Sequence, residues 1–410
     1  MIKLLIIGYV WPEPNSSAAG SRMLQLIGVF REQGWAITFA SPAKDSEYMT
    51  DLVKQGIQKV SIALNDSSFD EFIAETRPDI VLFDRFMIEE QFGWRVSKQC
   101  PQAMSVLETV DLHCLRAARE RAHKDGRQLE LADLSGDLAK REIASIFRSD
   151  LSLIISKKEI ELLTGTYKVG VDLIHYAPFM LDPLDRQSTD SWRSFHDRNH
   201  FISIGNFRHA PNMDAVLYLK EIIWPRIREQ LPSAELHVYG AYPPSTLGQL
   251  NEPSRGFCIK GRAGHSREEM EKARVCLAPL RFGAGIKGKL VEAMICGTPS
   301  VTTGIGAESM HAGLPWNGSI KDNPDEFAQA AVNLYQHKSE WYAAQVNGIA
   351  IINNIYNIDD HGQILVDKIN KIREDLDNHR LNNFTGSMLK YHLLKSTEYM
   401  GRWIEAKNKY

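Results

Sequence analysis

Two series of short apolar runs, each rich in β-branched residues and interleaved with longer amphipathic stretches, constrain the fold of this chain most strongly. The first series reads KLLIIGY, AITFAS, DIVLFD, MSVLET and LSLIIS, and the second reads FISIGNF, ELHVYG, GFCIKG, VCLAPL and PSVTT. Runs of this kind that alternate with helical stretches are typical of parallel sheets covered by helices. The sequence therefore predicts an α/β fold of two facing, doubly wound, Rossmann-like domains.

A polar, proline-containing segment without hydrophobic periodicity, FMLDPLDRQSTDSWRSFHDRNH, separates the two series. A chain of 410 residues is also too long for one ordinary core. We place the domains at residues 1–187 and 198–375, followed by a helical segment at 376–410. Packing on the domains is the favoured interpretation of that segment, and contact with a membrane surface is the alternative. The alternative rests on large apolar residues that lie among basic ones: Met388, Leu393, Tyr399 and Trp403.

Composition and charge narrow the classes of function. A net charge of -3 gives no electrostatic case for nucleic acid as a partner. The apolar start MIKLLIIGYVWPEP is too short for an export signal, and no run is long enough to cross a bilayer. Five cysteines without metal-ligand spacing favour reduced thiols in a cytoplasmic protein and argue against structural zinc. They are Cys100, Cys114, Cys258, Cys276 and Cys296.

The stretch at 283–290, Gly-Ala-Gly-Ile-Lys-Gly-Lys-Leu, is compatible with three kinds of phosphate-binding loop. A P-loop places a hydroxyl after its lysine to hold magnesium, whereas this chain has Leu290. A dinucleotide fingerprint should follow the first strand of a Rossmann unit, whereas this stretch follows the fourth run of the second series. An NTPase and an oxidoreductase are therefore both disfavoured.

The third interpretation uses the neighbours of this stretch. The run VCLAPL, a glycine-rich turn and a helix starting near Ile286 would place a helix N-terminus behind a diphosphate. Arg281, Lys287 and Lys289 add positive charge. Glu292 follows one to two turns into the helix, where a carboxylate can accept hydrogen bonds from both hydroxyls of a ribose. The pattern therefore predicts a cradle for a nucleoside diphosphate.

The sequence also indicates whether the diphosphate site needs a metal. The only Asp-x-Asp, Asp375 to Asp377, lies in a charged helical stretch far from any strand end. A helix N-terminus and side-chain cations can stabilise a diphosphate without a metal. We therefore predict no metal ligand and no resident cofactor.

These segments together resemble one known family. VCLAPLRFGAGIKGKLVEAMICGTPSVTT, with IGAE after it, resembles the donor-site signature of the group 1 (family 4) glycosyltransferases of the GT-B fold. Three further segments agree in order and spacing: FISIGNFRHAPNMDAVLYLKEIIWPRI, SVLETVDLHCLRAARER and WPEPNSSAAGSRMLQLIGVFREQGW. The resemblance covers nearly the whole chain.

The resemblance implies a function for each part of the chain. The N-terminal domain would bind the acceptor, the C-terminal domain the nucleotide-sugar donor, and a C-terminal helix would cross back onto the N-terminal domain. It implies a retaining, metal-independent transfer of a hexosyl-type sugar from a nucleotide-diphosphate sugar to an acceptor hydroxyl. The acceptor would be a glycan or lipid-linked glycan in cell-envelope polysaccharide synthesis, handled in the cytoplasm with a peripheral contact at the inner membrane face.

Family members usually carry two donor-site glutamates separated by seven residues. The second corresponds to Glu292, with the ribose hydroxyls as its expected partners, but the first falls at Ala284. The resemblance extends the donor set to these residues: Gly205, Arg208, Gly283, Ala284, Gly285, Ile286, Lys287, Glu292 and Glu308.

Many relatives also place an arginine and a lysine on the loop after the first strand of the second domain. Here those positions are Asn206 and Asn212, with Arg208 between them. The positive charge for the leaving diphosphate is therefore expected from Lys289 together with Arg281, although either could be a solvated surface charge.

The N-terminal domain supplies the remaining candidates. Asp111 and His113 follow the run MSVLE directly, so both should face the cleft, and the histidine resembles a family residue that approaches the donor sugar. A structural histidine and solvated arginines are the competing interpretations. The acceptor set comprises Asn15, Ser16, Ser17, Arg22 and Arg116, of which one serine or asparagine could simply be a helix N-cap.

Two other functions remain open at this point. A nucleotide-sugar 2-epimerase can use the same two-domain fold. A catalytically silent nucleotide-binding scaffold is suggested by Ala284 and by the missing Arg/Lys pair.

Overall fold

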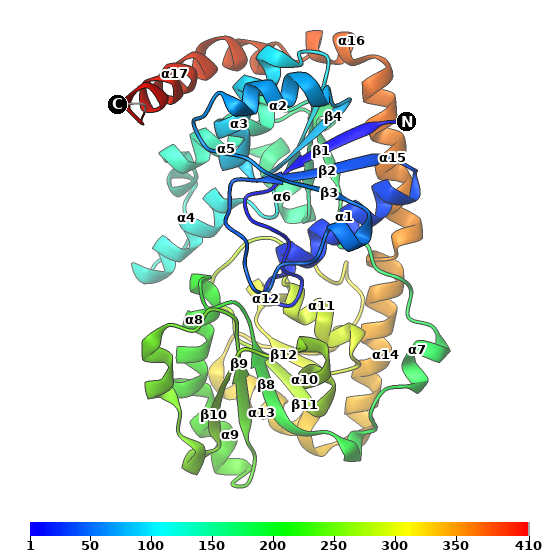
Figure 1. Ribbon diagram of the computed structural model, residues 1–410. Helices are drawn as coiled ribbons and strands as arrows, with labels where there is room; N and C mark the ends of the chain where they lie inside the picture. Colours follow the sequence, from blue (N-terminus) through cyan, green and yellow to red (C-terminus); the bar gives the residue numbers. More distant parts are fainter. Residues whose placement is uncertain (409–410) are drawn as a thin grey trace.

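The computed structural model describes residues 1–408, with the side chains of residues 392–395 left out, and contains two α/β domains stacked along the long axis of the molecule (Figure 1). The N-terminal domain holds a fully parallel seven-stranded sheet of order β3-β2-β1-β4-β5-β6-β7. Its strands are β1 Lys3–Ile7, β2 Ala36–Ser41, β3 Gln58–Ser61, β4 Ile80–Asp84, β5 Met104–Glu108, β6 Leu151–Ile154 and β7 Ile174–Tyr176.

The C-terminal domain holds a second fully parallel sheet, of six strands in the order β10-β9-β8-β11-β12-β13. Its strands are β8 Asn199–Ile204, β9 Leu236–Tyr239, β10 Phe257–Gly261, β11 Ala273–Ala278, β12 Ser300–Thr302 and β13 Gly318–Ile320. All ten predicted strands and the two-domain α/β fold are confirmed. The sequence pattern missed β3, β7 and β13, since these short edge strands bury little apolar surface.

Helices cover both faces of each sheet. Those of the N-terminal domain are α1 Ala18–Glu32, α2 Ser68–Thr76, α3 Phe86–Gln99, α4 His113–Lys124, α5 Asp137–Arg148 and α6 Lys157–Gly165. Those of the C-terminal domain are α8 Ala210–Tyr218, α9 Trp224–Gln230, α10 Ser266–Lys272, α11 Gly288–Ile295, α12 Gly304–Ala307, α13 Pro324–Gln336 and α14 Lys338–Ile355, with a π-helix at Leu219–Ile223. The linking segment forms α7 Arg186–Asp190, and the chain ends in α15 Ile358–Glu374, α16 Leu376–Leu381 and α17 Phe384–Asn408.

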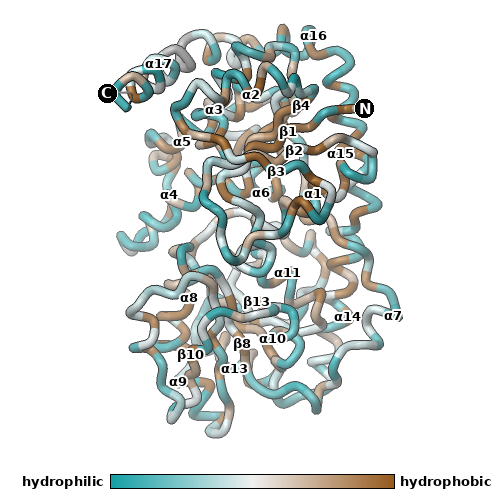
Figure 2. The backbone as a smooth tube through the Cα atoms, in the orientation of Figure 1, coloured by the Kyte–Doolittle hydropathy of each residue, from teal (hydrophilic) through white to brown (hydrophobic). Residues whose placement is uncertain are grey.

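Alternation along the strands divides the N-terminal core into two clusters. Leu4 and Ile6 pack on one face of β1, and Leu5 and Ile7 pack on the other. Because both faces are covered, the strands are apolar throughout, and Figure 2 shows the central strands of this domain as its most hydrophobic segments. The C-terminal domain is built in the same way.

The chain returns to the N-terminal domain earlier than the predicted boundary at residue 375. α15 packs its apolar face into the N-terminal core beside α1, through Leu365, Val366, Ile369 and Ile372. The return therefore begins at Ile358, directly after α14, because α15 has an apolar stripe that only the N-terminal core covers. α17 contacts α3 and α5. Asp375 lies at the break between α15 and α16 rather than inside a helix. The side chain of Leu393 and residues 409–410 of the predicted segment lie outside the described residues.

The strand order fixes where a ligand site can form. In the first sheet the order reverses between β1 and β4, and in the second between β8 and β11. The loops after such strands diverge and leave a crevice at the carboxyl ends. The glycine-rich loop follows β11, which pairs with β8, so it lies at a switch point although it does not follow the first strand. Within the described residues, no helix is both long enough and apolar enough to span a bilayer.

Candidate active site

A cleft of about 440 Å³ opens between the two domains, at the carboxyl ends of both sheets. The loops after β1, β8 and β11 form much of its wall. A site of this volume accommodates a ligand of the size of a nucleotide sugar. Twelve of the predicted site residues line it: Asn15, Ser16, Ser17, Asp111, Arg116, Gly205, Gly283, Ala284, Ile286, Lys287, Lys289 and Glu292.

Two helix N-termini, one from each domain, meet at this cleft. α1 begins at Ala18 and α11 begins at Gly288, two residues later than predicted. A Cβ on Gly288 would lie 2.3 Å from the Cβ of Ala18, so only glycine permits this approach. Helix N-termini carry unsatisfied N–H groups and partial positive charge, and an anion between them would be stabilised by both.

Lys289 brings a cation to the switch point itself. Its Nζ donates to Asn212 Oδ1 at 2.8 Å. A Cβ on Gly205, in the loop after β8, would lie 2.8 Å from the same Nζ, so any larger residue there would displace the lysine. Burial lowers the pKa of Lys289 to about 8. The lysine is thus held between the two loops that diverge at the switch point.

Lys287 lies two residues away but points differently. Its Nζ donates to the backbone oxygen of Gly285 at 2.7 Å and to that of Ala284 at 3.2 Å. Burial lowers its pKa to about 8, and Glu308 and Glu159 oppose that effect. Lys287 therefore stabilises the conformation of the glycine-rich loop.

The N-terminal domain also holds the glycine-rich loop in place. The backbone N–H of Gly285 donates to Glu159 Oε1 at 3.0 Å, and the same oxygen accepts from Leu112 N–H at 2.8 Å. Burial raises the pKa of Glu159 to about 8, with the charge of Asp111 adding to the effect. The N–H of Gly285 is thus taken by the carboxyl group of Glu159 and is not free to bind a diphosphate.

Glu292 lies on the cleft wall with one carboxylate oxygen already engaged. Ser266, at the start of α10, donates its Oγ–H to Glu292 Oε1 at 2.5 Å. Burial raises the pKa of Glu292, and the bond from Ser266 opposes this shift. The bond fixes the rotation of the carboxylate and leaves Oε2 for a ligand.

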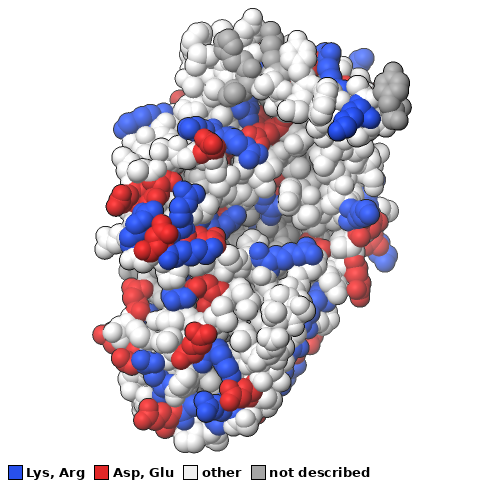
Figure 3. All heavy atoms as spheres, turned by 90° about the vertical axis from the view of Figure 1, so that its left-hand side faces the viewer, with Lys and Arg blue, Asp and Glu red and all other residues white. Residues whose placement is uncertain are grey.

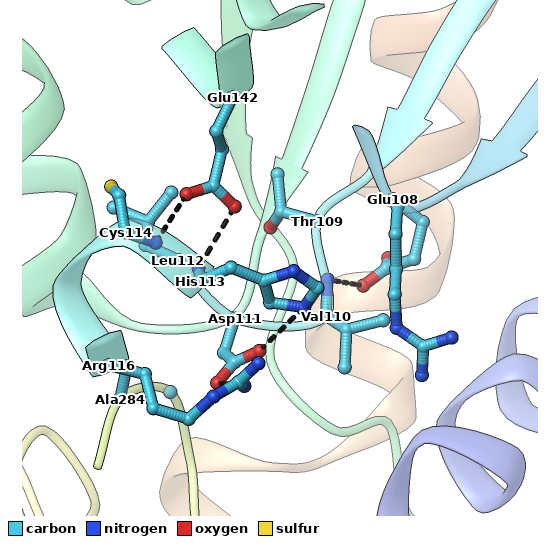
Figure 4. A network of polar contacts seen from close by, with 12 residues as sticks. Glu108, Thr109, Val110, Asp111, Leu112, His113, Cys114, Arg116, Glu142 and Ala284 are labelled. Carbon is cyan, nitrogen blue, oxygen red and sulfur yellow. Dashed lines mark hydrogen bonds and ion pairs between the residues drawn. The ribbon is translucent and has the colours of Figure 1, made fainter. Parts of the chain in front are cut away.

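Asp111, His113 and Arg116 form one polar network at the start of α4 (Figure 4). Asp111 pairs with the guanidinium of Arg116, and its Oδ1 lies 3.4 Å from His113 Nε2. Burial disfavours the charge on Asp111, yet Arg116 and His113 outweigh it and lower the pKa of this carboxyl. Burial lowers the pKa of His113 to about 4, so its imidazole is neutral at physiological pH. Asp111 and Arg116 line the cleft, whereas His113 packs edge-on against Phe86.

Buried carboxylates shape the turn that presents this network. Glu142 accepts from the N–H groups of His113 and Cys114 at 2.9 and 2.8 Å, which caps the N-terminus of α4. Glu108 accepts from Val110 N–H at 2.9 Å, and Val110 has a φ of 65°, a strained value for a β-branched residue. This bond holds the turn that carries Asp111 into the cleft.

Six predicted residues do not line the cleft: Arg22, His113, Arg208, Arg281, Gly285 and Glu308. Arg22 is fully buried, and its Nε and one terminal nitrogen donate to the two carboxylate oxygens of Glu108 at 2.7 and 2.9 Å. It therefore stabilises the carboxyl end of β5 and is not available to bind an acceptor. Arg208 lies 3.7 Å from the ring of Tyr242.

Arg281 and Glu308 are each committed to another ion pair. Arg281 binds Asp214 with Nε 2.9 Å from Oδ2, so its predicted partnership with Lys289 is not found. Glu308 accepts hydrogen bonds from both terminal nitrogens of Arg119, at 2.7 and 2.8 Å. Arg119 also donates to the Gly283 oxygen at 2.8 Å. This pair joins α4 to the glycine-rich loop, so Glu308 acts between the domains.

The sequence interpretation missed three residues that the fold brings to the site. His209, just before α8, lines the cleft, and burial followed by the charge of Arg116 lowers its pKa. Ser266 and Glu159 bind Glu292 and the glycine-rich loop. The HAPN sequence at a helix start was the available signal for His209, whereas nothing local marks Ser266 or Glu159.

Three potential metal ligands meet away from the cleft. Glu235, His237 and Cys258 place their ligand atoms within 4.8 Å of one another at the amino ends of β9 and β10. Their distance along the sequence hid this group from the spacing argument. The arrangement lies at the end of the sheet opposite the cleft.

Comparison with known proteins gives this geometry a context. Residues 198–337 match the family model described as Glycosyl transferases group 1. Among solved structures, sucrose-phosphate synthase from Thermosynechococcus elongatus is 14% identical, with 91% of this chain and 99% of that chain covered and a TM-score of 0.65. A search of curated proteins gives no match.

Two further similar structures contain bound ligands. A mutant of S. aureus TarM in complex with fondaparinux, alpha-GlcNAc-glycerol and UDP is 9% identical, covers 91% of this chain and 100% of its own, and has a TM-score of 0.68. Anabaena HepE in complex with UDP and glucose is 12% identical, covers 90% and 100%, and has a TM-score of 0.65. The family match confirms the resemblance for residues 198–337, and these likenesses show the GT-B fold.

Proposed function

From the premise that this chain carries a group 1 glycosyltransferase domain in a GT-B fold, we propose that it moves a sugar from a nucleotide-diphosphate sugar to an acceptor hydroxyl. One observation carries the proposal: the uncapped N-terminus of α11 and the Nζ of Lys289 lie at the wall of one cleft with Glu292. An anion site beside a diol-binding carboxylate is the chemistry that a nucleoside diphosphate requires.

The donor half of the reaction uses the C-terminal domain. The N–H groups of the first turn of α11 and the ammonium of Lys289 bind the diphosphate and stabilise the charge that grows on it as the bond to the sugar breaks. Glu292, oriented by Ser266, accepts from the two ribose hydroxyls. These groups supply the stabilisation without a metal or a resident cofactor. UDP is the first nucleotide to test, because the similar structures of TarM and HepE hold it.

The acceptor half uses the N-terminal domain. Ser16, Asn15 and Arg116 face the space that an acceptor hydroxyl would enter. The hydroxyl oxygen attacks the anomeric carbon on the face from which the diphosphate leaves, and a phosphate oxygen takes the proton, which retains the configuration. Asp111 contacts the sugar, and His113 positions Asp111 through the short gap between Nε2 and Oδ1. A glycan or lipid-linked glycan of the cell envelope is the proposed acceptor, reached from the cytoplasmic side.

The experiment is a thermal-shift and calorimetric screen of the purified chain against UDP-, GDP-, dTDP-, ADP- and CMP-linked sugars. We expect one nucleotide to stabilise the wild type. Glu292→Ala should lower its affinity roughly 10- to 100-fold, since hydrogen bonds to a charged group contribute about 1.5–3 kcal/mol each. Glu229→Ala, at an exposed position of the same domain, is the matched control and should bind normally.

Four outcomes would contradict the proposal. Full affinity and turnover in Glu292→Ala would remove the ribose assignment. Stabilisation by NAD(H) or ATP but by no nucleotide sugar would indicate that the glycine-rich loop is a dinucleotide-binding loop or a P-loop. Release of free nucleotide without an acceptor would indicate the 2-epimerase, and tight binding without turnover in acceptor trials would indicate a silent scaffold.

A further inference from the structure

The amino end of the second sheet carries a group of metal-ligating side chains that the cleft does not use. His237 on β9 and Cys258 on β10 are partners in the parallel ladder, so their side chains leave the same face of the sheet. Glu235 precedes His237 by two residues and lies on that face too. The ligand atoms of these three residues lie within 4.8 Å of one another. We call the three residues the amino-end cluster.

The donor atoms of the amino-end cluster match one class of metal ion. A cysteine sulfur, an imidazole nitrogen and a carboxylate oxygen are each common ligands of Zn²⁺, which prefers a tetrahedral arrangement. Mg²⁺ and Ca²⁺ bind oxygen ligands and do not select a thiolate. The thiolate of Cys258 and the carboxylate of Glu235 together balance the charge of a divalent ion, and His237 binds as the neutral imidazole. The donor set therefore indicates zinc, with a fourth position open to water.

The fold holds two of the three ligands in place and leaves the third accessible. His237 and Cys258 are fixed by neighbouring strands, and the ring of His237 stacks on that of His200 with centroids 3.8 Å apart. The side chain of Glu235 is 53% exposed, so an ion can enter from its side. Glu235 Oε2 lies 2.7 Å from His237 Nε2, whereas two ligands of one zinc ion are about 3.3 Å apart. Binding therefore requires only a small outward movement of the exposed carboxylate.

Two polar groups on this face lack protein partners. Cys258 is 7% exposed, and its thiol makes no hydrogen bond to any residue that the structure describes. Nε2 of His200 is buried and likewise has no hydrogen-bond partner among the described residues. Buried polar groups in native proteins are normally paired. This face therefore has bonding capacity that the protein atoms do not use.

The charge of the surrounding surface does not attract cations by itself. Figure 3 shows acidic and basic side chains interspersed over the lower, C-terminal domain on the face that it draws. Lys260, two residues after Cys258 on β10, is exposed, and its charge opposes a cation at the amino-end cluster. An ion there would therefore be held by direct bonds to its ligands, not by a general negative field.

We propose that Glu235, His237 and Cys258 bind a structural Zn²⁺ that joins β10, the edge strand of the second sheet, to β9. On binding, the thiol of Cys258 releases its proton to solvent, and Glu235 exchanges its hydrogen bond with His237 for a bond to the ion. The imidazole keeps its one proton on the ring nitrogen that does not bind the metal.

The site has a structural consequence for the cleft and revises one prediction. β10 continues into Arg262 and Ala263, which line the cleft, so the metal would stabilise from its far end the strand that carries this part of the wall. The sequence-based argument against structural zinc considered spacing along the chain, whereas sheet pairing brings these ligands together. The amino-end cluster lies at the end of the sheet opposite the cleft, so the inference does not depend on the proposed reaction.

The test is titration of the full, reduced, chelator-treated chain with Zn²⁺ in competition with a chromophoric chelator. We expect the wild type to bind a single equivalent of zinc. Cys258→Ser should lower the affinity at least about 100-fold, because the loss of an outer partner of a metal ligand alone costs about 10- to 100-fold. Cys100→Ser removes a partly buried thiol of the N-terminal domain and should bind zinc as the wild type does. Titration with Co²⁺ should give a thiolate-to-cobalt charge-transfer band in the wild type and in Cys100→Ser, but not in Cys258→Ser.

Two variants at exposed positions test the site without disturbing the core. Glu235→Gln should keep the wild-type melting temperature in the presence of chelator and lower zinc affinity at least about tenfold. Lys260→Gln removes the opposing charge and should raise the affinity severalfold. Zinc should raise the melting temperature of the wild type and of Cys100→Ser, since a ligand of the folded state stabilises it, and should leave that of Cys258→Ser unchanged.

Three outcomes would overturn the proposal. They are no saturable zinc binding by the wild type, equal zinc affinity in the wild type, Cys258→Ser and Glu235→Gln, and a cobalt complex without the thiolate band. Equal affinity in all variants would identify an adventitious ion bound to other side chains. If Cys258→Ser fails to fold, the affinities of Glu235→Gln and Lys260→Gln still decide the result, because both substitutions are on the surface.

Discussion

The two helix N-termini that meet across the cleft differ in how their backbone N–H groups are used. At α1, the N-cap Ser17 accepts from Gly20 N–H with its own Oγ at 3.1 Å. At α11, the N-cap is Lys287, which makes no side-chain capping bond within the described structure and turns back to the Gly285 oxygen. The two ends have the same dipole, but the side chain of Ser17 takes one first-turn N–H of α1, whereas the side chain of Lys287 takes none of α11. We infer from this comparison that capping favours α11 over α1 as the end that binds the anion.

Two lysines at the start of α11, Lys287 and Lys289, also differ in whether their charged group is free to bind a ligand. Lys287 is buried and Lys289 is partly buried, and desolvation lowers the pKa of each to about 8. Lys287 is bound by carbonyl oxygens of its own loop, and Lys289 is bound by the neutral amide of Asn212 at the cleft. We infer that Lys287 maintains the shape of the loop and that Lys289 neutralises the ligand.

The largest expected effect is on diphosphate affinity, and it tests the different roles of Lys287 and Lys289. Lys289→Met should lower the affinity for the nucleoside diphosphate about 100-fold, the scale seen when one stabilising donor is removed from a charged centre. Lys287→Met should cost about 1–3 kcal/mol of unfolding free energy instead, because two buried carbonyl oxygens lose their donor. Calorimetric titration and urea unfolding of both variants separate the roles. An exchange of the two phenotypes would mean that the ligand draws Lys287 out of the loop.

The pH dependence of binding sharpens the assignment to Lys289. With a pKa lowered to about 8 by burial, its ammonium is present below pH 8 and is lost above it. Diphosphate affinity should therefore be constant below this pH and fall by up to about tenfold per pH unit above it. Lys289→Arg, which stays charged, should remove the alkaline decline. A decline that persists in this variant would instead point to Lys287.

The smallest effect concerns the capped helix. Ser17→Ala removes the cap of α1 and should lower the unfolding free energy by about 1 kcal/mol. Diphosphate affinity should stay within error of the wild type, because the N–H of Gly20 is not a ligand donor in this interpretation. A marked change in affinity would show that α1 also binds the anion and that capping does not distinguish the two helices.

The strands were predictable because fully buried parallel strands need continuous apolar runs, and these runs are visible in the sequence. The short strands β3, β7 and β13 were not, because they are only partly buried and carry no continuous apolar run. The position of α15 was missed for a related reason. An apolar stripe shows that a helix is covered, and it does not show which of two cores covers it.

Within the site, local spacing predicted the loop at 283–287, Lys289 and Glu292, and the cleft wall contains all of them except Gly285. Local spacing could not predict the ion pairs of Arg281 with Asp214 and of Arg22 with Glu108, because each pair joins residues far apart along the chain. Ser266 and Glu159 were invisible for the same reason. From the sequence alone, a serine at a helix start such as Ser266 is expected to be a cap, and a glutamate in a first turn such as Glu159 is expected to be solvated.

The sequence by itself determined the two α/β domains, the place of the glycine-rich loop before a helix, and the chemical inventory of phosphate-binding groups and a diol-binding carboxylate. These follow from periodicity and from residues adjacent along the chain. Only the tertiary structure decided which cations remain available to a ligand, which loop amides are taken by buried carboxylates, and which helices the C-terminal helix contacts. Those outcomes depend on competition among charged groups brought together by folding, and the energy of a charge is set by its partners and its burial more than by its neighbours in sequence.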